Sequence, residues 1–180
     1  MNDNQVAMTK ALVDGLARAL FMRKNLMATI NYTIRPATVD DLPTIIKLLV
    51  DDELGKHREI ANDDLAIEYK TAFENISNDN NNHLVVMEHE AKVIGVLQLT
   101  ILQHLTHKGS KRGHIEGVRI DKTYRGQGLG QALITWAINQ SRKLNCHMLQ
   151  LTTDLQRPQA LNFYTQLGFI ASHSGLKLYL

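Results

Sequence analysis

The residues with the most evident chemical use form a glycine-rich segment, Arg125-Gly126-Gln127-Gly128-Leu129-Gly130. It follows a strand-like run over residues 115–120 and leads into an amphipathic helix pattern. Three glycines in five residues leave backbone N–H groups open to close approach, and the helix N-terminus behind them carries partial positive charge. These features predict a cradle for a phosphate or pyrophosphate group.

The spacing of these glycines excludes two common phosphate-binding motifs. A P-loop needs Gly-Lys followed by Ser or Thr, whereas Gln131 and Ala132 follow Gly130. The dinucleotide motif G-x-G-x-x-G would need a glycine in place of Gln131. A tight strand-to-helix turn that uses its glycines for steric reasons alone stays open as an alternative.

The elements that must position this segment follow from the hydrophobic pattern. Strands are expected at residues 32–35, 84–88, 93–102, 114–120 and 147–152, with a basic loop at 107–112. Helices are expected after Pro36, from Asp63 to Ile76, from Gln127 to Lys143 and from Pro158 to Leu167. Phe169–Ala171 and Leu176–Leu180 are expected to close the sheet as two short strands. The early strands form a hairpin and the later ones alternate with helices, which predicts an α/β (α+β) fold with a mixed, mostly antiparallel central sheet flanked by helices.

Composition limits the class of protein. A chain of 180 residues suggests one domain, and its 20 basic and 18 acidic residues lack the basic excess typical of nucleic-acid binders. No apolar run is long enough to cross a membrane, so neither a nucleic acid nor a membrane is an expected partner. The single cysteine, Cys146, cannot form an internal disulfide, which favours a reducing, cytoplasmic location. It is expected to be a small buried filler and not a nucleophile.

The first thirty residues are interpreted as a helical N-terminal extension to a domain that covers residues 31–180. Apolar residues recur there at helical spacing, at Leu12, Leu16, Leu20 and Phe21. Asp14 and Arg18 interrupt that stretch, which argues against a secretory signal. Upstream sequence before a later start at Met27 stays open as an alternative.

Two motifs together resemble the GNAT superfamily of N-acetyltransferases. Arg125, Gly128 and Gly130 fill the places of its Arg/Gln-x-x-Gly-x-Gly/Ala acetyl-CoA loop. The run Ala160-Leu161-Asn162-Phe163-Tyr164-Thr165-Gln166-Leu167-Gly168-Phe169 is similar to its Ala-x-x-Phe-Tyr-x-x-x-Gly-Phe helix. The resemblance covers about Tyr32 to Leu180 and implies the GNAT acyltransferase fold. One departure is Arg157, which stands where many members have an Asn near the pantetheine arm and which can only donate hydrogen bonds.

This resemblance implies an N-acetyltransferase that takes acetyl-CoA as co-substrate, uses no metal, and acetylates a primary amine of a small molecule or protein. The backbone N–H groups of residues 127–130 would hold the pyrophosphate, and a backbone N–H near Val118 would stabilise the oxyanion. The cofactor-binding residues that it implies are Val118, Arg119, Ile120, Arg125, Gly126, Gln127, Gly128, Leu129, Gly130 and Gln131.

Two side chains are the candidate catalytic residues. Glu116 stands two residues before Val118, so we expect both on one face of a buried strand, where Glu116 would be the general base. A salt bridge from Glu116 to Arg112 or Arg119 is the alternative. Tyr164 occupies the general-acid position of the family and would protonate the leaving thiolate, with core packing as its alternative.

Other polar groups carry weaker signals. The eight histidines lack the spacing of a zinc motif, although His114 is expected on the same face as Glu116. The acidic run Asp51-Asp52-Glu53 ends the first long helix and reads as a solvated helix end, or as a group that attracts a cationic amine. No motif in the sequence identifies the acceptor amine. A homodimer is a possible oligomeric state. The alternative function is a non-catalytic acyl-CoA-binding or regulatory module that acts through a protein partner.

Overall fold

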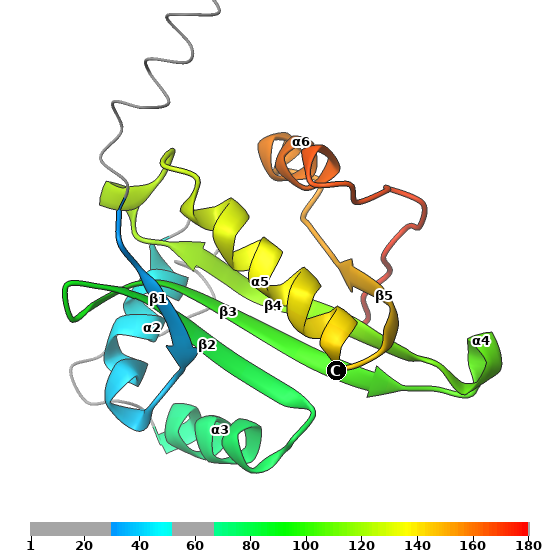
Figure 1. The fold of residues 1–180 in the computed structure, drawn as a ribbon, viewed down its shortest axis with the longest axis horizontal. Helices are drawn as coiled ribbons and strands as arrows, with labels where there is room; N and C mark the ends of the chain where they lie inside the picture. Colours follow the sequence, from blue (N-terminus) through cyan, green and yellow to red (C-terminus); the bar gives the residue numbers. More distant parts are fainter. Residues whose placement is uncertain (1–29, 52–66, 180) are drawn as a thin grey trace, which may run out of the picture. The chain divides into compact units, whose positions relative to one another are not determined.

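A computed structural model describes residues 30–51 and 67–179 of the chain (Figure 1). From Tyr32 onward, the described residues belong to one compact unit. The predicted N-terminal extension lies outside the described residues except for its last residue, and so does the start of the helix predicted from Asp63.

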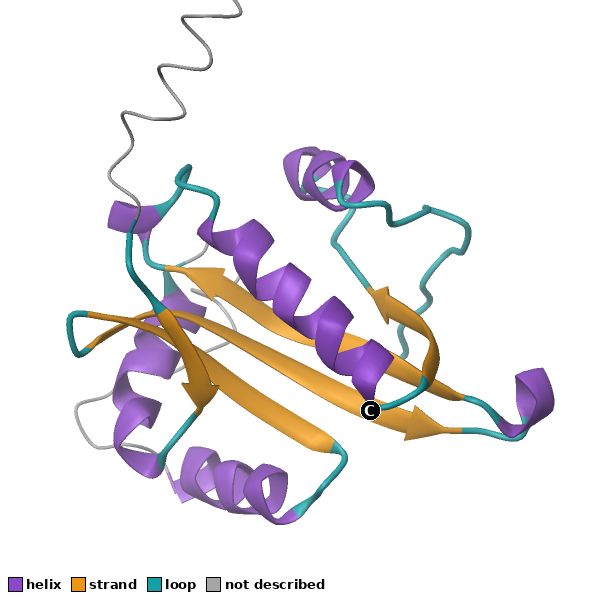
Figure 2. Ribbon diagram, in the orientation of Figure 1, coloured by secondary structure: helices purple, strands orange, loops and turns teal. Residues whose placement is uncertain are grey.

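The centre of this unit is a five-stranded mixed sheet whose strands lie side by side in chain order (Figure 2). Its strands are β1 (Thr33–Pro36), β2 (Asn82–His89), β3 (Lys92–Gln103), β4 (Lys111–Ile120) and β5 (Cys146–Leu151). The first four strands are antiparallel neighbours, and β5 is parallel to β4. The predicted hairpin is confirmed as β2 and β3, whose turn at Glu90 and Ala91 has left-handed backbone angles. The mixed, mostly antiparallel sheet predicted from the sequence is therefore confirmed.

The described helices connect these strands in the order that the sequence pattern predicts, although some of the bounds differ. They are η1 (Val39–Asp41), α2 (Leu42–Val50), α3 (Ile67–Asn78), α4 (Thr106–Gly109), η3 (Lys122–Tyr124), α5 (Leu129–Lys143) and α6 (Pro158–Gln166). The segment predicted as a basic loop holds the short turn α4, and β4 begins at Lys111, earlier than expected. Because parallel strands need a crossover connection, α5 is the element that makes the β4–β5 pairing possible.

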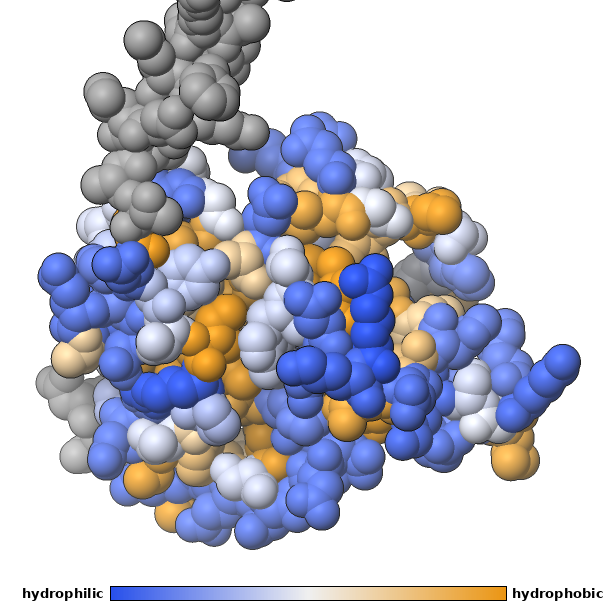
Figure 3. Space-filling view, viewed as in Figure 1, coloured by the Kyte–Doolittle hydropathy of each residue, from blue (hydrophilic) through white to orange (hydrophobic). Residues whose placement is uncertain are grey.

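Apolar side chains cover both faces of the sheet and thereby fix β4 between two packed layers. On one face the buried residues of α5 include Leu133, Ile134 and Ala137. On the other face, a cluster joins α2 to the sheet through Ile45, Leu48, Val86, Val93 and Val96. Hydrophilic side chains predominate on the molecular face seen in Figure 3, while apolar ones show around α6 and along both sides of α5.

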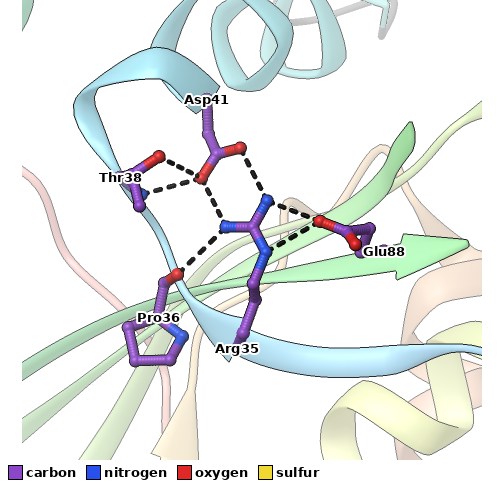
Figure 4. Close-up of polar contacts among 5 residues, drawn as sticks. All are labelled: Arg35, Pro36, Thr38, Asp41 and Glu88. Carbon is purple, nitrogen blue, oxygen red and sulfur yellow. Dashed lines mark hydrogen bonds and ion pairs between the residues drawn. The ribbon is translucent and has the colours of Figure 1, made fainter. Parts of the chain in front are cut away.

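A charged network attaches the start of α2 to the edge of the sheet (Figure 4). Arg35 of β1 donates to the two carboxylate oxygens of Asp41 at 2.7 and 3.0 Å, and its Nε donates to Glu88 at 2.8 Å. Asp41 also accepts a hydrogen bond from the backbone N–H of Thr38 at 2.7 Å. The Arg35 guanidinium, followed by the bonds from Thr38, holds the pKa of the buried Asp41 carboxyl below its ordinary value.

The C-terminal segment does not form the two predicted strands, so that part of the fold prediction is wrong. Residues 169–179 have no regular secondary structure. Ile170, Leu176 and Leu178 are 84%, 95% and 86% exposed, so no apolar layer covers them. An alternating pattern gives a strand only when a neighbouring strand and a packed face complete it, and neither is available to this segment in the described chain.

Replacing Asp41 by Asn should lower the free energy of unfolding by about 1–3 kcal/mol at neutral pH, because Arg35 loses one of its two charged partners, the buried one. Since the pKa of Asp41 is lower in the folded protein than in the unfolded chain, its stabilisation is complete above the unfolded value of about 4 and is lost as pH falls through the folded value. Urea unfolding between about pH 7 and about pH 3 measures both effects.

The exposed neighbour Asp40 supplies the control, since Asp40→Asn should change the free energy of unfolding by less than about 0.5 kcal/mol. The difference between wild type and Asp41→Asn should shrink toward acid pH. A difference that stays constant over the whole pH range would contradict the assigned role of the carboxylate.

Candidate functional site

The site is built around the place where β4 leaves β5. The two strands pair from Lys111 with Cys146 to Ile115 with Leu151, and no pair follows. β4 nevertheless continues as a strand to Ile120, so residues 116–120 extend beyond their parallel neighbour. The backbone edge of these residues on the β5 side is available to an extended ligand that can add to it as a strand would.

A bulge in β4 changes which side chains share a face of the sheet. Glu116 pairs with Gln98 of β3, and Arg119 pairs with Val96. Between these two pairs, β4 has two residues where β3 has one. Gly117 permits this with a φ of 61°. Because directly paired residues share a face, Glu116 and Arg119 lie on one face and Val118 on the other. The prediction that Glu116 and Val118 share a face is therefore wrong.

The glycine-rich segment forms the turn that begins α5. Gly126 and Gly128 have φ values of 76° and 80°, and a Cβ added to either would meet no atom within 4 Å. Gly128 is the N-cap, and its carbonyl accepts from the N–H of Ala132 at 3.1 Å. The N–H groups of residues 126–131 donate to no described residue. Open space, free donors and the positive end of α5 make this turn fit a pyrophosphate.

The side chain of Arg125 supports this turn from α2. Its Nε donates to the carbonyl of Ile120 at 2.9 Å, and its Nη2 donates to the carbonyl and to a carboxylate oxygen of Asp51 at 3.0 and 3.1 Å. Arg125 therefore links the end of α2, the end of β4 and the glycine turn. Asp51 belongs to the acidic run of the sequence, whose other two members lie outside the described residues. A cationic role for Arg125 near phosphates stays a prediction.

Tyr164 lies on α6, in a ring cluster beside the glycine turn. Its ring packs edge-on against Phe163 and Phe169, with ring centroids 5.1 and 5.8 Å apart. Phe163 in turn reaches the start of α5, where its Cζ lies 3.5 Å from a Cβ built on Gly130. The family-like helix and the glycine turn, which are distant in sequence, are thus in contact.

The phenol of Tyr164 is protonated at neutral pH, as an ordinary phenol is, and burial strengthens that preference. Desolvation raises the pKa of Tyr164 above its ordinary value, and the positive charges of Arg119 and Arg157 oppose this shift more weakly. The hydroxyl donates to no described residue, so the backbone carbonyl that a purely structural tyrosine would use is not found in the described part of the chain. A protonated phenol with a free hydroxyl is suited to proton donation.

Glu116 is not buried, contrary to the expectation from the sequence. Its side chain is 60% exposed, and its Oε1 lies 3.6 Å from the Nε2 of His114. The alternative interpretation named Arg112 or Arg119 as its partner, whereas the partner observed is a histidine on the same strand. His114 does share a face with Glu116, as predicted, because both are paired to β3 before the bulge.

Two contacts of the site were missed by the sequence interpretation. Gln150 of β5 donates from its Nε2 to the Nδ1 of His114 at 3.2 Å. Arg119 donates from its Nη1 to the carbonyl of Val118 at 2.8 Å. The sequence shows Gln150 as a polar residue in the strand after α5, which was the only signal for it. The register of the β4–β5 pair is needed to see that it lies opposite His114.

Other kinds of site find no support in the part of the chain that is described. Among residues 30–51 and 67–179, no three His, Cys, Asp or Glu side chains gather in a way that could hold a metal ion. Within the same ranges, no helix has the length and apolar character needed to cross a membrane. Burial raises the pKa of the Cys146 thiol, which disfavours the thiolate that a nucleophile would need.

Comparison with known proteins gives several matches. The family described as "Acetyltransferase (GNAT) family" matches residues 43–169. The crystal structure of a transcriptional regulator from Bacillus halodurans C-125 is similar, with 47% identity and a TM-score of 0.81, over 83% of this chain and 100% of that one.

Two curated N-acetyltransferases match over shorter regions. A glucosamine 6-phosphate N-acetyltransferase of Trypanosoma brucei brucei is 37% identical over 87 residues, which are 48% of this chain and 57% of that protein. An aminoalkylphosphonate N-acetyltransferase of Salmonella typhimurium is 30% identical over 95 residues, 53% of this chain and 61% of that protein. The chain spans about half the length of the curated relatives it matches.

The family match covers the strand that carries Glu116, the glycine turn and the helix that carries Tyr164. The five-stranded mixed sheet and the structural match from Bacillus halodurans C-125 agree with it. The chain therefore belongs to the GNAT family of acetyltransferases.

Proposed function

We propose that the protein is an N-acetyltransferase that moves an acetyl group from acetyl-CoA to an amine by direct attack. The observation that carries the proposal is the free end of β4, residues 116–120, next to the open glycine turn. A strand edge and an anion cradle at adjacent places fit a ligand that has an extended amide-bearing arm joined to a pyrophosphate. Acetyl-CoA has both, and its thioester supplies the activated acetyl group.

The donor would be held mainly by backbone groups. The N–H groups of residues 126–130 donate to no described residue and would bind the pyrophosphate. Backbone groups of Val118 and Ile120 would pair with the pantetheine arm. The carbonyl of Val118 already accepts a hydrogen bond from the guanidinium of Arg119, and the carbonyl of Ile120 accepts one from Arg125. The N–H groups of Val118 and Ile120 are therefore the ones that we assign to the pantetheine arm.

The proposed reaction needs one base and one acid. The amine nitrogen attacks the thioester carbonyl carbon, and its surplus proton passes through water to the solvated Glu116 carboxylate. An N–H group near Val118 stabilises the negative charge on the carbonyl oxygen. When the carbon–sulfur bond breaks, the Tyr164 hydroxyl gives its proton to the thiolate and is later reprotonated from solvent. The products are an N-acetyl amide and free CoA.

The acceptor proposed is a small amine, because two of the curated relatives are named for glucosamine 6-phosphate and aminoalkylphosphonate. A second candidate function is a regulatory module that binds acyl-CoA without turnover. It is favoured by one observation, the similarity to a protein described as a transcriptional regulator. A cytoplasmic location is part of the first proposal and is supported by the single cysteine.

A panel of amines with acetyl-CoA, read by thiol release and by product mass, tests the function. Glucosamine 6-phosphate and an aminoalkylphosphonate should be included, together with a polyamine and a peptide with a free N-terminus. We expect thiol release and a mass increase of one acetyl group for at least one amine. Saturable binding of acetyl-CoA without release for every acceptor would favour the regulatory module instead.

Tyr164→Phe should lower kcat by about 100-fold while leaving the affinity for acetyl-CoA within about twofold, since only the proton donor is removed. The alkaline limb of the kcat profile should disappear, because the raised pKa of Tyr164 sets that limb in the wild type. Tyr179→Phe, a substitution in the exposed C-terminal segment, is the matched control and should be neutral. Wild-type turnover in Tyr164→Phe at saturating substrates would eliminate the acid role.

Glu116→Gln should lower kcat by about 100-fold and flatten the acid limb of the pH–rate profile, because an amide cannot accept the proton from the amine. Steady-state kinetics over a range of pH values measures both changes. Glu90→Gln, in the exposed turn between β2 and β3, controls for the loss of one surface carboxylate. An acid limb that is the same in Glu116→Gln and in the wild type would show that another group is the base.

A further inference from the structure

His114 connects the closed part of the sheet to the open part. It pairs with Thr100 of β3 on one side and with Gln150 of β5 on the other. The Gln150 pair is the last but one before β4 and β5 separate, whereas Glu116 is the first residue of β4 past the separation. Accordingly, 19% of the His114 side chain is exposed and 60% of the Glu116 side chain. A well-packed imidazole thus stands next to a solvated carboxylate.

In the orientation that its amide has in the structure, Gln150 favours one tautomer of the imidazole. The amide Nε2 of Gln150 can only donate, so the Nδ1 of His114 accepts at 3.2 Å. In the neutral ring the proton is therefore on Nε2, the nitrogen that lies 3.6 Å from the Glu116 carboxylate. At 3.6 Å this contact is longer than a hydrogen bond, and a small rotation of either side chain would bring the Nε2–H within hydrogen-bond distance of the carboxylate.

We propose that Gln150 and His114 are positioning residues that hold the Glu116 carboxylate in place as the base. The proposal rests on the function given above. An exposed glutamate samples several rotamers, and only some of them would face the amine. A donor fixed from β5 selects among these rotamers without itself contacting the reacting atoms.

The surroundings of His114 agree with such a role. On its own strand, the charged residues on the same face are Arg112, Glu116 and, beyond the bulge, Arg119. The residues that pair with it on β3 and β5 are Thr100 and Gln150, which are uncharged. The hydroxyl of Thr100 donates to Asn82 at 2.8 Å, so it belongs to a separate set of contacts. Thr100 therefore provides a control site that is adjacent to His114 but not connected to Glu116.

Three substitutions separate positioning from simple packing. His114→Leu keeps a side chain of similar volume but removes the hydrogen-bond donor to Glu116. We expect kcat to fall by about 10-fold, the rate equivalent of one ordinary hydrogen bond. The KM for acetyl-CoA should be unchanged. His114→Gln, whose Nε2 can replace the imidazole Nε2, should restore most of the rate. Thr100→Val, the control, should leave the rate unchanged. Melting temperatures identify any variant that is impaired by unfolding.

A double-mutant cycle tests whether His114 acts through Glu116. In the Glu116→Gln background, His114→Leu should produce no further loss of kcat, because the base that it positions is already gone. A further 10-fold loss in that background, or no rescue by His114→Gln, would overturn the proposal while leaving the acetyltransferase function intact. Failure of every amine in the panel would overturn the function, and the positioning of a base with it.

The tautomer can be read without any activity. Nitrogen-15 NMR of the full chain at a pH where His114 is neutral should show a protonated Nε2 and an unprotonated Nδ1. In Gln150→Leu this preference should weaken, and the two tautomers should become mixed. A protonated Nδ1 in the wild type would overturn the proposal directly.

Discussion

The parting of β4 from β5 is the constraint on which the rest of the site depends. The two strands are paired only up to Ile115, yet β4 remains extended to Ile120 because β3 continues to pair with it on the other side. Packing of α5 on one face and of α2 on the other holds β4 in this position. A fully paired β4 would have no free edge, and only its side chains could then contact acetyl-CoA. The glycine turn, Glu116 and Tyr164 become one site only because this edge stays open.

Side chains from distant parts of the chain stabilise that arrangement. Arg125 connects the glycine turn to the end of α2 and to β4 through three hydrogen bonds, so a residue expected to serve as a phosphate ligand also supports the loop. Phe163 packs beside Gly130 and brings α6 to the start of α5. The contacts of Arg125 with Asp51 and of Phe163 with Gly130 join elements separated by a long stretch of sequence. The site is therefore a property of the folded sheet and not of either motif alone.

Much of the fold followed from local patterns, and the site followed only in part. Alternation and turn residues were enough to predict the β2–β3 hairpin, and the glycine spacing was enough to place the turn at the start of α5. The bulge at Gly117 was not predictable from the alternation of apolar and polar residues along β4. Its one extra residue reverses the face of the sheet on which each later side chain of β4 lies. Gln150 was missed because the register of a parallel pair is set by tertiary packing. The prediction of two C-terminal strands was wrong because an apolar pattern does not show whether a partner strand is available.

The central claim is that the free end of β4 and the glycine turn together bind the donor. Backbone amide NMR of the full chain during titration with CoA tests it most directly, with pantetheine, which lacks the pyrophosphate, as the comparison ligand. The account predicts that CoA shifts the amides of residues 116–120 and 126–130, that residues 111–115 change little, and that pantetheine affects the β4 group alone. Shifts confined to other parts of the chain, or none at saturating CoA, would contradict the account.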